Sequence, residues 1–240
     1  MDWCFACRFV KAKNAAGRPK LGLITLSVKL KTLASHVLHT LLRSFLSYQE
    51  YLMSKPIDFS LRDPEGGVNE LFYQRWSPRT FKSTPIPKES LRIIFDAVRW
   101  TPSCYNEQPW LFITSTEKTH QAFVNLLLDG NQTWAKSAPV IGFVVANRFF
   151  ERNGNDNGFS EFDSGAAWMS MTMQARKLGL YTHGMGGVKF DEVYTALNLD
   201  VNQQQVLCAF ALGELEVLES AEEQVKVSSR KALVEIWQEF

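Results

Sequence analysis

The sequence predicts a globular protein of the α+β class, in which helices and strands share one core. Apolar residues make up 45% of the 240 residues and charged residues 21%, a balance that supports a folded chain rather than a disordered one. Residues 111–114 and 140–146 are short apolar runs rich in branched and aromatic side chains, as in buried strands. Elsewhere apolar residues recur at the spacing of one helix face.

The helices are predicted from this spacing and from their end signals. One begins at Pro87 and ends before Pro102, with an apolar face made by Leu91, Ile94, Phe95 and Val98. Another fills residues 117–128. Residues 164–175 contain no charged side chain, so we expect a helix that is buried on most sides and stops at Gly179.

The remaining elements are a strand over residues 205–212 and a final helix over residues 231–238. Residues 54–69 are polar and punctuated by Pro and Gly, and they are predicted to form an arm or loop. No G-x-G-x-x-G follows a strand and no G-x-x-x-x-G-K-[ST] is present. The sequence therefore excludes a Rossmann dinucleotide site and a P-loop.

Residues 1–52 differ in charge from the rest of the chain. They carry eight Lys or Arg against two acidic residues, a net charge of +6, whereas the remaining 18 basic and 23 acidic residues give −5. The mildly acidic body lacks the basic surface that nucleic-acid binding requires. Basic and His residues interrupt the apolar stretch 21–46, so no membrane span is expected.

Three interpretations of residues 1–52 are open: an organelle transit peptide, an interfacial amphipathic helix, or a start codon placed too early. Met53 opens the part of the chain in which every recognisable segment lies. We favour the early start, or a dispensable extension, and expect residues 53–240 to form the functional domain.

The four cysteines predict no disulfide framework at this chain length. Cys4 and Cys7 form a C-x-x-C pair without a second pair or a His at metal spacing, so an incidental pair is favoured over a zinc or redox site. Cys208 lies in an apolar run, where a buried inert thiol is expected. The chain is therefore expected to be reduced, cytoplasmic and free of bound metal.

The basic segment Arg75-Trp76-Ser77-Pro78-Arg79 carries the first candidate site. If its backbone is extended, residues 75, 77 and 79 point the same way, and two guanidiniums and a hydroxyl converge on one spot. Such a group suits a phosphate or another small anion. The alternative is a solvated basic turn.

The second candidate site is the segment Pro102-Ser103-Cys104-Tyr105-Asn106-Glu107-Gln108-Pro109-Trp110, which precedes an apolar strand. Its two amides offer both hydrogen-bond donors and acceptors, as the mixed polar edge of a heterocycle requires. The alternative is an ordinary turn between a helix and a strand.

Three further segments are weaker when taken alone. The glycines of His183-Gly184-Met185-Gly186-Gly187 allow a close backbone approach or a positive φ, or simply a flexible turn, and His183 beside them is predicted to be incidental. Arg230 is either an anion ligand or a surface cap on the final helix. Trp134 either walls a site or packs in the core.

In their order and context these segments resemble the FMN-dependent nitroreductase family over about residues 72–237. The resemblance implies an α+β fold with a central, mainly antiparallel sheet flanked by helices, and an intertwined homodimer. It also implies FMN as the cofactor and NADH or NADPH as the electron donor. Trp76 departs from the family pattern, in which a second basic residue is common at this position.

The resemblance also implies a role for each segment. Arg75, Ser77 and Arg230 would hold the FMN phosphate and ribityl end, and Arg79 would approach N1 and O2 of the ring, where a cation stabilises the reduced flavin. Backbone N–H groups of Gly186 and Gly187 would lie at N5. Residues 102–110 would reach a flavin held mainly by the other subunit.

The predicted site residues fall into two sets. The cofactor-binding set is Arg75, Trp76, Ser77, Arg79, Pro102, Ser103, Cys104, Asn106, Gln108, Gly186, Gly187 and Arg230. The weaker candidates for substrate contact are Tyr105 and Trp134. No side chain is predicted to act as a catalytic acid, base or nucleophile, because the flavin carries the chemistry.

The implied activity is reduction of nitroaromatics, quinones or similar small electrophiles by ping-pong hydride transfer through flavin N5. Two alternatives are open: a flavoenzyme of the same scaffold that performs dehalogenation, flavin fragmentation or azoline oxidation, and a protein that stores FMN without turnover. The polar run 152–158 is predicted to be a mobile loop, with a lid as the alternative.

Overall fold

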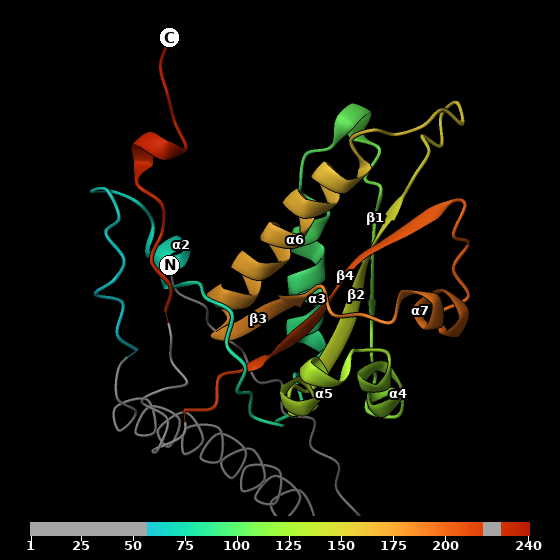
Figure 1. Cartoon of the computed structure of the whole chain (residues 1–240), viewed down its shortest axis with the longest axis horizontal. Coiled ribbons are helices and arrows are strands. Elements are labelled where there is room, and N and C mark those ends of the chain that lie inside the picture. The colour runs from blue at the N-terminus through green and yellow to red at the C-terminus, as the bar shows by residue number, and fades with distance from the viewer. Residues whose placement is uncertain (1–56, 218–226) are drawn as a thin grey trace, which may run out of the picture. The chain divides into compact units, whose positions relative to one another are not determined.

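Four antiparallel strands form the central sheet of the computed structural model, which describes residues 57–217 and 227–240 (Figure 1). The strand order is β1-β2-β4-β3, and each neighbouring pair is antiparallel. The strands are β1 Trp110–Thr114, β2 Val140–Asn147, β3 Leu180–Met185 and β4 Gln204–Glu214. The predicted α+β class with an antiparallel sheet between helices is therefore confirmed.

Helices cover both faces of the sheet. Helices α3 (Lys88–Val98) and α6 (Ser160–Lys177) pack on one face, where Figure 1 shows α6 running across the strands. The other face is covered by α4 (His120–Asn125), α5 (Asp129–Ala135) and α7 (Phe190–Ala196). A short helix, α2 (Glu70–Gln74), precedes the basic segment.

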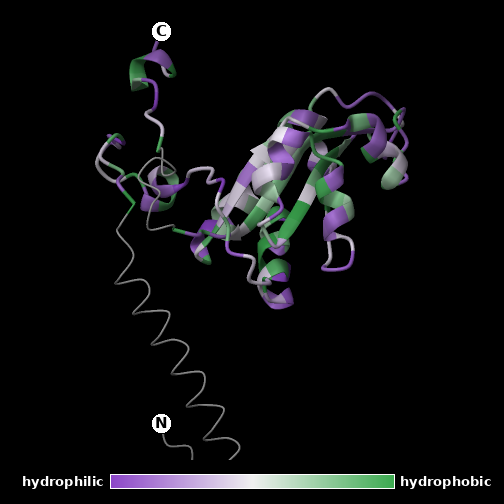
Figure 2. Ribbon diagram, turned by 60° about the horizontal axis from the view of Figure 1, so that its bottom comes forward, coloured by the Kyte–Doolittle hydropathy of each residue, from purple (hydrophilic) through white to green (hydrophobic). Residues whose placement is uncertain are grey.

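Alternation along the central strands divides the core into two clusters. On β4, Phe210 and Leu212 face α3 and α6, whereas Ala209 and Ala211 face the opposite cluster. On β2, Val144 and Val145 divide in the same way. This is the period of two expected of a strand that is buried on both faces. Figure 2 shows the sheet as hydrophobic and the outer surfaces of the helices as largely hydrophilic.

Several of the predicted elements are confirmed, and others need correction. The helix after Pro87 and the strands at 111–114, 140–146 and 205–212 are present. The helix predicted over 117–128 is shorter, because the extended backbone of Leu128 separates α4 from α5. The sequence also gave no indication of β3 or α7.

The uncharged helix is longer and less buried than predicted. Helix α6 begins at Ser160, and only one side of it is fully buried, since Ala166, Met169 and Met173 are half-buried and Gly165 is exposed. It ends at Lys177, and Gly179 follows with a φ of +80°, as predicted for a helix stop. The outward side of α6 is therefore apolar but incompletely covered.

The final helix predicted over residues 231–238 is wrong. Only a 3₁₀ turn, Leu233–Glu235, forms there. Val234, Ile236 and Trp237 expose more than half of their surface, so these apolar side chains lack the tertiary contacts that stabilise a short helix.

Residues 1–56, with Cys4 and Cys7, lie outside the described residues, so the predictions made for them stay predictions. Within residues 57–217 and 227–240, no helix combines the length and apolar character needed to cross a bilayer. Burial raises the pKa of the Cys208 thiol to about 11, in agreement with the predicted inert thiol.

Candidate functional site

The basic segment is extended and its side chains alternate as predicted. Trp76 and Pro78 are buried, whereas Ser77 and Arg79 are exposed and Arg75 is half-buried. Trp76 packs edge-on against Tyr181 of β3, with 6.1 Å between the ring centroids. An Nη1–H of Arg75 donates to the Ser77 hydroxyl over 3.4 Å. The buried residues thus hold the segment on the core, and the polar residues form one outward row.

Three guanidiniums from distant parts of the chain gather at the start of this row. Burial and the nearby Arg230 lower the pKa of Arg75. Burial, Arg230 and Arg75 lower the pKa of Arg62. Each shift means that the charged form is disfavoured by its surroundings. The predicted residues Arg75 and Arg230 are therefore brought together.

Arg62 is a member of this cluster that the sequence did not predict. One of its Nη1–H groups donates to the Tyr73 carbonyl over 3.1 Å, while its Nε and Nη2 are buried and have no hydrogen-bond partner among the described residues. It lies in the arm before α2, in a stretch with no recognisable motif, so only the folded chain reveals its neighbours.

No carboxylate neutralises the cluster within the described parts of the chain. The salt bridges found there join Lys82 to Glu214, Arg99 to Asp96 and Lys189 to Glu192. Buried or crowded cations are normally paired, and unpaired nitrogens of a guanidinium are costly. An anion with several oxygens would satisfy both the charges and the open donors.

The row of polar side chains continues from Arg79 to α5 and β3. The Arg79 guanidinium lies 5.9 Å from the centre of the Trp134 ring, and this ring lies 4.5 Å from the ring of His183. His183 Nδ1 is 2.8 Å from the Pro78 carbonyl, and because a carbonyl can only accept, Nδ1 carries the proton. His183 therefore holds the basic segment against β3, and the prediction that it takes no part in the chemistry stays a prediction.

Burial lowers the pKa of His183, and the nearby Arg79 and Arg75 lower it further. The ring is consequently neutral at physiological pH. It braces the basic segment against β3 and adds no charge to a site that is already cationic.

The glycine pair after β3 lies beside the same helix, α5. The Asn131 amide donates to the Gly187 carbonyl over 3.1 Å, and a Cβ built on Gly187 would meet the Asn131 amide nitrogen at 2.6 Å. Gly187 therefore lies at a close approach to Asn131, and a close approach is one of the two reasons predicted for a glycine there. Neither Gly186 nor Gly187 has a positive φ.

Gly186 faces open space. A Cβ added there would meet no atom within 4 Å. Among the described residues, the N–H groups of Gly186 and Gly187 donate to no other backbone group outside the strands. This edge offers free donors beside a surface on which a flat ring could lie.

The second motif forms a tight turn before β1, and three of its residues have a positive φ. These are Tyr105 (53°), Asn106 (58°) and Gln108 (51°). The Gln108 N–H donates to the Ser103 hydroxyl over 2.9 Å, and the Cys104 N–H donates to Asp163 of α6 over 2.9 Å. Pro102, Tyr105, Asn106 and Gln108 are exposed. Strained backbone held this way is typical of a functional turn.

The two motifs lie at opposite ends of α6 within one chain. The turn before β1 is bonded to Asp163 in the first turn of α6. At the last turn, Arg176 stacks 4.5 Å from the Tyr181 ring, which in turn contacts Trp76 of the basic segment. Figure 1 shows the turn before β1 and the start of β3 at these two ends. An 18-residue helix is about 27 Å long, so the structure does not bring Asn106 and Gln108 to Arg75.

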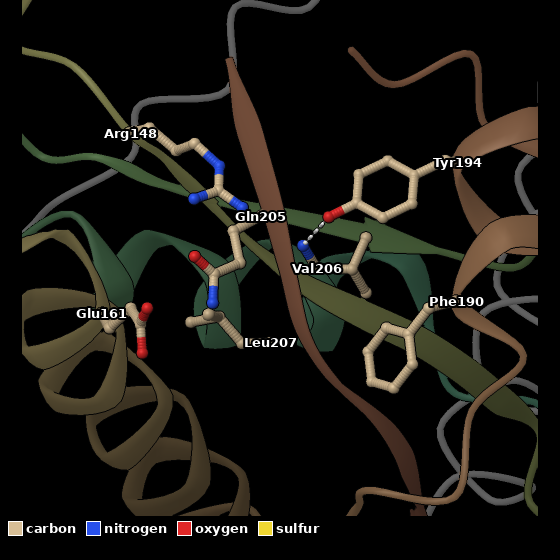
Figure 3. Close-up of a pocket in the computed structure, with 7 residues that line it drawn as sticks. All are labelled: Arg148, Glu161, Phe190, Tyr194, Gln205, Val206 and Leu207. Atoms are coloured by element: carbon tan, nitrogen blue, oxygen red, sulfur yellow. Dashed lines mark hydrogen bonds between the residues drawn. The ribbon is translucent and has the colours of Figure 1, made fainter. Parts of the chain in front are cut away.

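A separate hollow of about 530 Å³ opens beside β4 at the end of the molecule where α6 begins. Figure 3 shows Arg148 and Glu161 on one side of it, with Phe190 and Tyr194 of α7 on the other. The Tyr194 hydroxyl accepts from the Val206 N–H over 3.0 Å. None of the predicted site residues lines this hollow.

Comparison with known proteins agrees with these features. The model of the Nitroreductase family matches residues 73–133 and 114–214. A solved structure described as an oxidoreductase containing FMN is 36% identical, with a TM-score of 0.69 over 78% of this chain and 97% of that chain.

Two bacterial relatives are more distant. A nitroreductase-type protein of Desulfovibrio desulfuricans, solved in complex with FMN, is 25% identical with a TM-score of 0.60, over 74% of this chain and 98% of that one. A Streptomyces coelicolor protein named as an NADH dehydrogenase or NAD(P)H nitroreductase is 24% identical over 143 residues, 51% of this chain and 73% of the relative. Since the family model spans more than half of the sequence, the chain belongs to the nitroreductase family.

Proposed function

We propose that this protein is a homodimeric, FMN-dependent NAD(P)H oxidoreductase that reduces nitroaromatics, quinones or similar small electrophiles. The observation that carries the proposal is the group of guanidiniums of Arg62, Arg75 and Arg230, which no carboxylate of residues 57–217 or 227–240 pairs, at one end of a polar row that runs to the open glycine edge. The relatives solved with FMN, and the relative named for NAD(P)H, support the choice of cofactor and donor.

The guanidinium cluster fits the phosphate of FMN. A phosphate monoester carries nearly two negative charges and three acceptor oxygens, which match the neighbouring positive charges of Arg62, Arg75 and Arg230. Ser77 is hydrogen-bonded to Arg75 and lies on the same outward row, where its hydroxyl can bind a phosphate or ribityl oxygen.

The other end of the row fits the flavin ring. Arg79 is linked through Trp134 to helix α5, and Asn131 of the same helix holds Gly187. A ring lying on the open face of Gly186 would therefore have a cation near one edge and free backbone N–H groups near another. When bound there, FMN would accept a hydride from the nicotinamide and return two electrons to the acceptor.

The side chains of the proposed site would bind and polarise the flavin and would not exchange protons with it. Arg79 supplies a fixed positive charge that favours an electron-rich ring. His183 is neutral, and its Nδ1–H is used by the Pro78 carbonyl, so it holds the basic segment in place. The proton that accompanies each hydride would come from water.

A second subunit would complete each site. Asn106 and Gln108 lie about a helix length from Arg75 in the same chain, so they can reach a flavin held by the arginines only in another copy. The incompletely covered side of α6 and the exposed Trp100 (78%) and Phe162 (77%) offer apolar surface for such an association.

Subunit complementation tests this arrangement. Arg75→Ala and Asn106→Ala protomers are each expected to form defective homodimers. A mixed dimer would carry one doubly altered site and one intact site, so mixing by co-expression should restore activity in the hybrid to about half that of the wild type. If each site were built within one protomer, every site in the mixture would carry one substitution and no activity would return.

The cofactor and the turnover are tested by the visible spectrum of the purified protein, recorded under anaerobic conditions before and after NADPH and then NADH. We expect flavin bands that bleach with at least one of these donors and recover on adding a quinone. Flavin bands that no nicotinamide bleaches would indicate an FMN storage protein. A colourless protein that takes up no added FMN would overturn the proposed function.

A further inference from the structure

The loop between β2 and α6 folds as a short hairpin that places Arg152 on an aromatic ring. The Phe150 N–H donates to the Asn155 carbonyl and the Gly154 N–H donates to the Phe150 carbonyl, each over 2.8 Å, and Gly154 has a φ of +71°. The guanidinium carbon of Arg152 consequently lies 4.1 Å from the centre of the Tyr105 ring. The polar run 152–158, predicted to be mobile, is thus held by defined backbone hydrogen bonds.

Tyr105 belongs to the second motif, between Cys104 and Asn106. Its φ of 53° turns the side chain outward, so that 73% of its surface is exposed. Its ring also meets Phe150 edge-on at 5.9 Å. The stacked pair of Arg152 and Tyr105 is therefore an exposed structure attached to the turn that carries Asn106.

The Arg152 guanidinium has donors to spare. It forms no salt bridge and donates no hydrogen bond within residues 57–217 and 227–240. Stacking uses the face of the planar guanidinium and leaves the N–H groups at its edge free to donate. A cation fixed in this way is pre-organised to bind an anion that lies beside the ring.

We propose that Arg152 and Tyr105 recognise an anionic group carried by a planar substrate as it enters the site of the neighbouring subunit. The inference rests on the proposed function, in which the turn carrying Asn106 reaches that site. Tyr105 would contact the flat part of the substrate, and Arg152 would bind its carboxylate, sulfonate or phosphate. The pair thereby sets a preference for acidic substrates.

Two molecules could supply this chemistry. One is the oxidising substrate, as an aromatic acid, and the other is NADPH, whose 2′-phosphate adjoins the adenine ring. Both place an anion next to a planar group. The two sources are separated by measuring the reductive and oxidative half-reactions individually.

The experiment uses the FMN-loaded wild type and Arg152→Gln. Stopped-flow reduction compares NADPH with NADH, and reoxidation of the reduced protein compares 4-nitrobenzoate with its neutral analogue 4-nitrobenzamide. With Arg152→Gln, we expect the second-order rate constant to fall about tenfold either for NADPH or for 4-nitrobenzoate. The rate constant for the corresponding comparison compound, NADH or 4-nitrobenzamide, should fall less than twofold. Which pair changes identifies the source of the anion.

Arg148→Gln is the matched control, because Arg148 precedes the same hairpin but faces the hollow shown in Figure 3. Arg148→Gln should leave two ratios of rate constants unchanged, that of NADPH to NADH and that of 4-nitrobenzoate to 4-nitrobenzamide. If Arg148→Gln changed one of these ratios and Arg152→Gln changed neither, the anion would bind at that hollow and the inference would be refuted.

The outcomes also separate this inference from the proposed function. A protein that holds FMN and is reduced by a nicotinamide, with both ratios unaltered by Arg152→Gln, overturns the inference alone. A protein that holds no FMN overturns both.

Discussion

Removing Arg75 should affect FMN binding and the stability of the apoprotein in opposite directions. Arg75 lies beside Arg230, and both burial and this neighbour lower its pKa. Its side-chain hydrogen bond to Ser77 is long at 3.4 Å, so little is lost locally when the side chain is shortened. In the apoprotein the guanidinium is therefore a crowded charge, and only a bound anion makes it favourable.

The magnitude follows from one charge-assisted contact. Such a contact contributes about 1.5–3 kcal/mol, so Arg75→Ala should raise the Kd for FMN roughly 10- to 150-fold. The melting temperature of the apoprotein should stay the same or rise, because one of three neighbouring like charges is gone. The stabilisation by added FMN should shrink in proportion to the lost affinity.

Quenching of flavin fluorescence on titration into apoprotein measures the Kd, and thermal unfolding with and without FMN measures the stability. Arg92→Ala, which removes an exposed arginine on α3 that forms no salt bridge with the described residues, is the control for the change in net charge. An FMN affinity within twofold of the wild type would refute the phosphate site. A drop of several degrees in the apoprotein would instead show that Arg75 supports the fold.

Two further predictions concern β3 and the glycine pair. Burial, Arg79 and Arg75 lower the pKa of His183 in the folded protein, so as the pH falls below about 6.5 the imidazole is protonated in the unfolded chain before it is protonated in the folded one. The stability of the wild type relative to His183→Gln should therefore decrease between pH 7 and pH 5, which thermal unfolding would measure. Gly187→Ala should lower the stability by only about 0.5–1.5 kcal/mol, because the end of the Asn131 side chain must turn away from the added Cβ and give up its hydrogen bond to the Gly187 carbonyl. Gly186→Ala should fold normally but lose FMN from the blocked face, and a Gly186→Ala variant with the FMN affinity of the wild type would contradict this assignment.

The parts of the site that could be predicted are those set by local sequence. The outward row at residues 75, 77 and 79 follows from the period of an extended chain, and the buried Trp76 and Pro78 follow from the same period. The close approach at Gly187 was one of two reasons predicted for a glycine there.

The missed features depend on contacts between distant segments. Arg62 has no motif around it, and its partners Arg75 and Arg230 become neighbours only after folding. The contact between His183 and Pro78 was missed because β3, a short strand ending in glycines, has too little apolar pattern to be recognised. The prediction of a final helix was wrong because the apolar side chains of residues 231–238 pack against no other part of the described chain.

In the proposed shared site, the length of α6 would tie cofactor binding to self-association. With the guanidiniums at one end and the strained turn at the other, a lone subunit would supply only part of the contacts to each flavin. Coupling between two binding equilibria is reciprocal, so FMN would raise the affinity of the subunits for each other by the same factor by which dimerisation raises the affinity for FMN. The apparent affinity for FMN would then rise with protein concentration, and dilution would release cofactor and subunits together. Expression level would thus act as a control on the fraction of this protein that is competent for turnover.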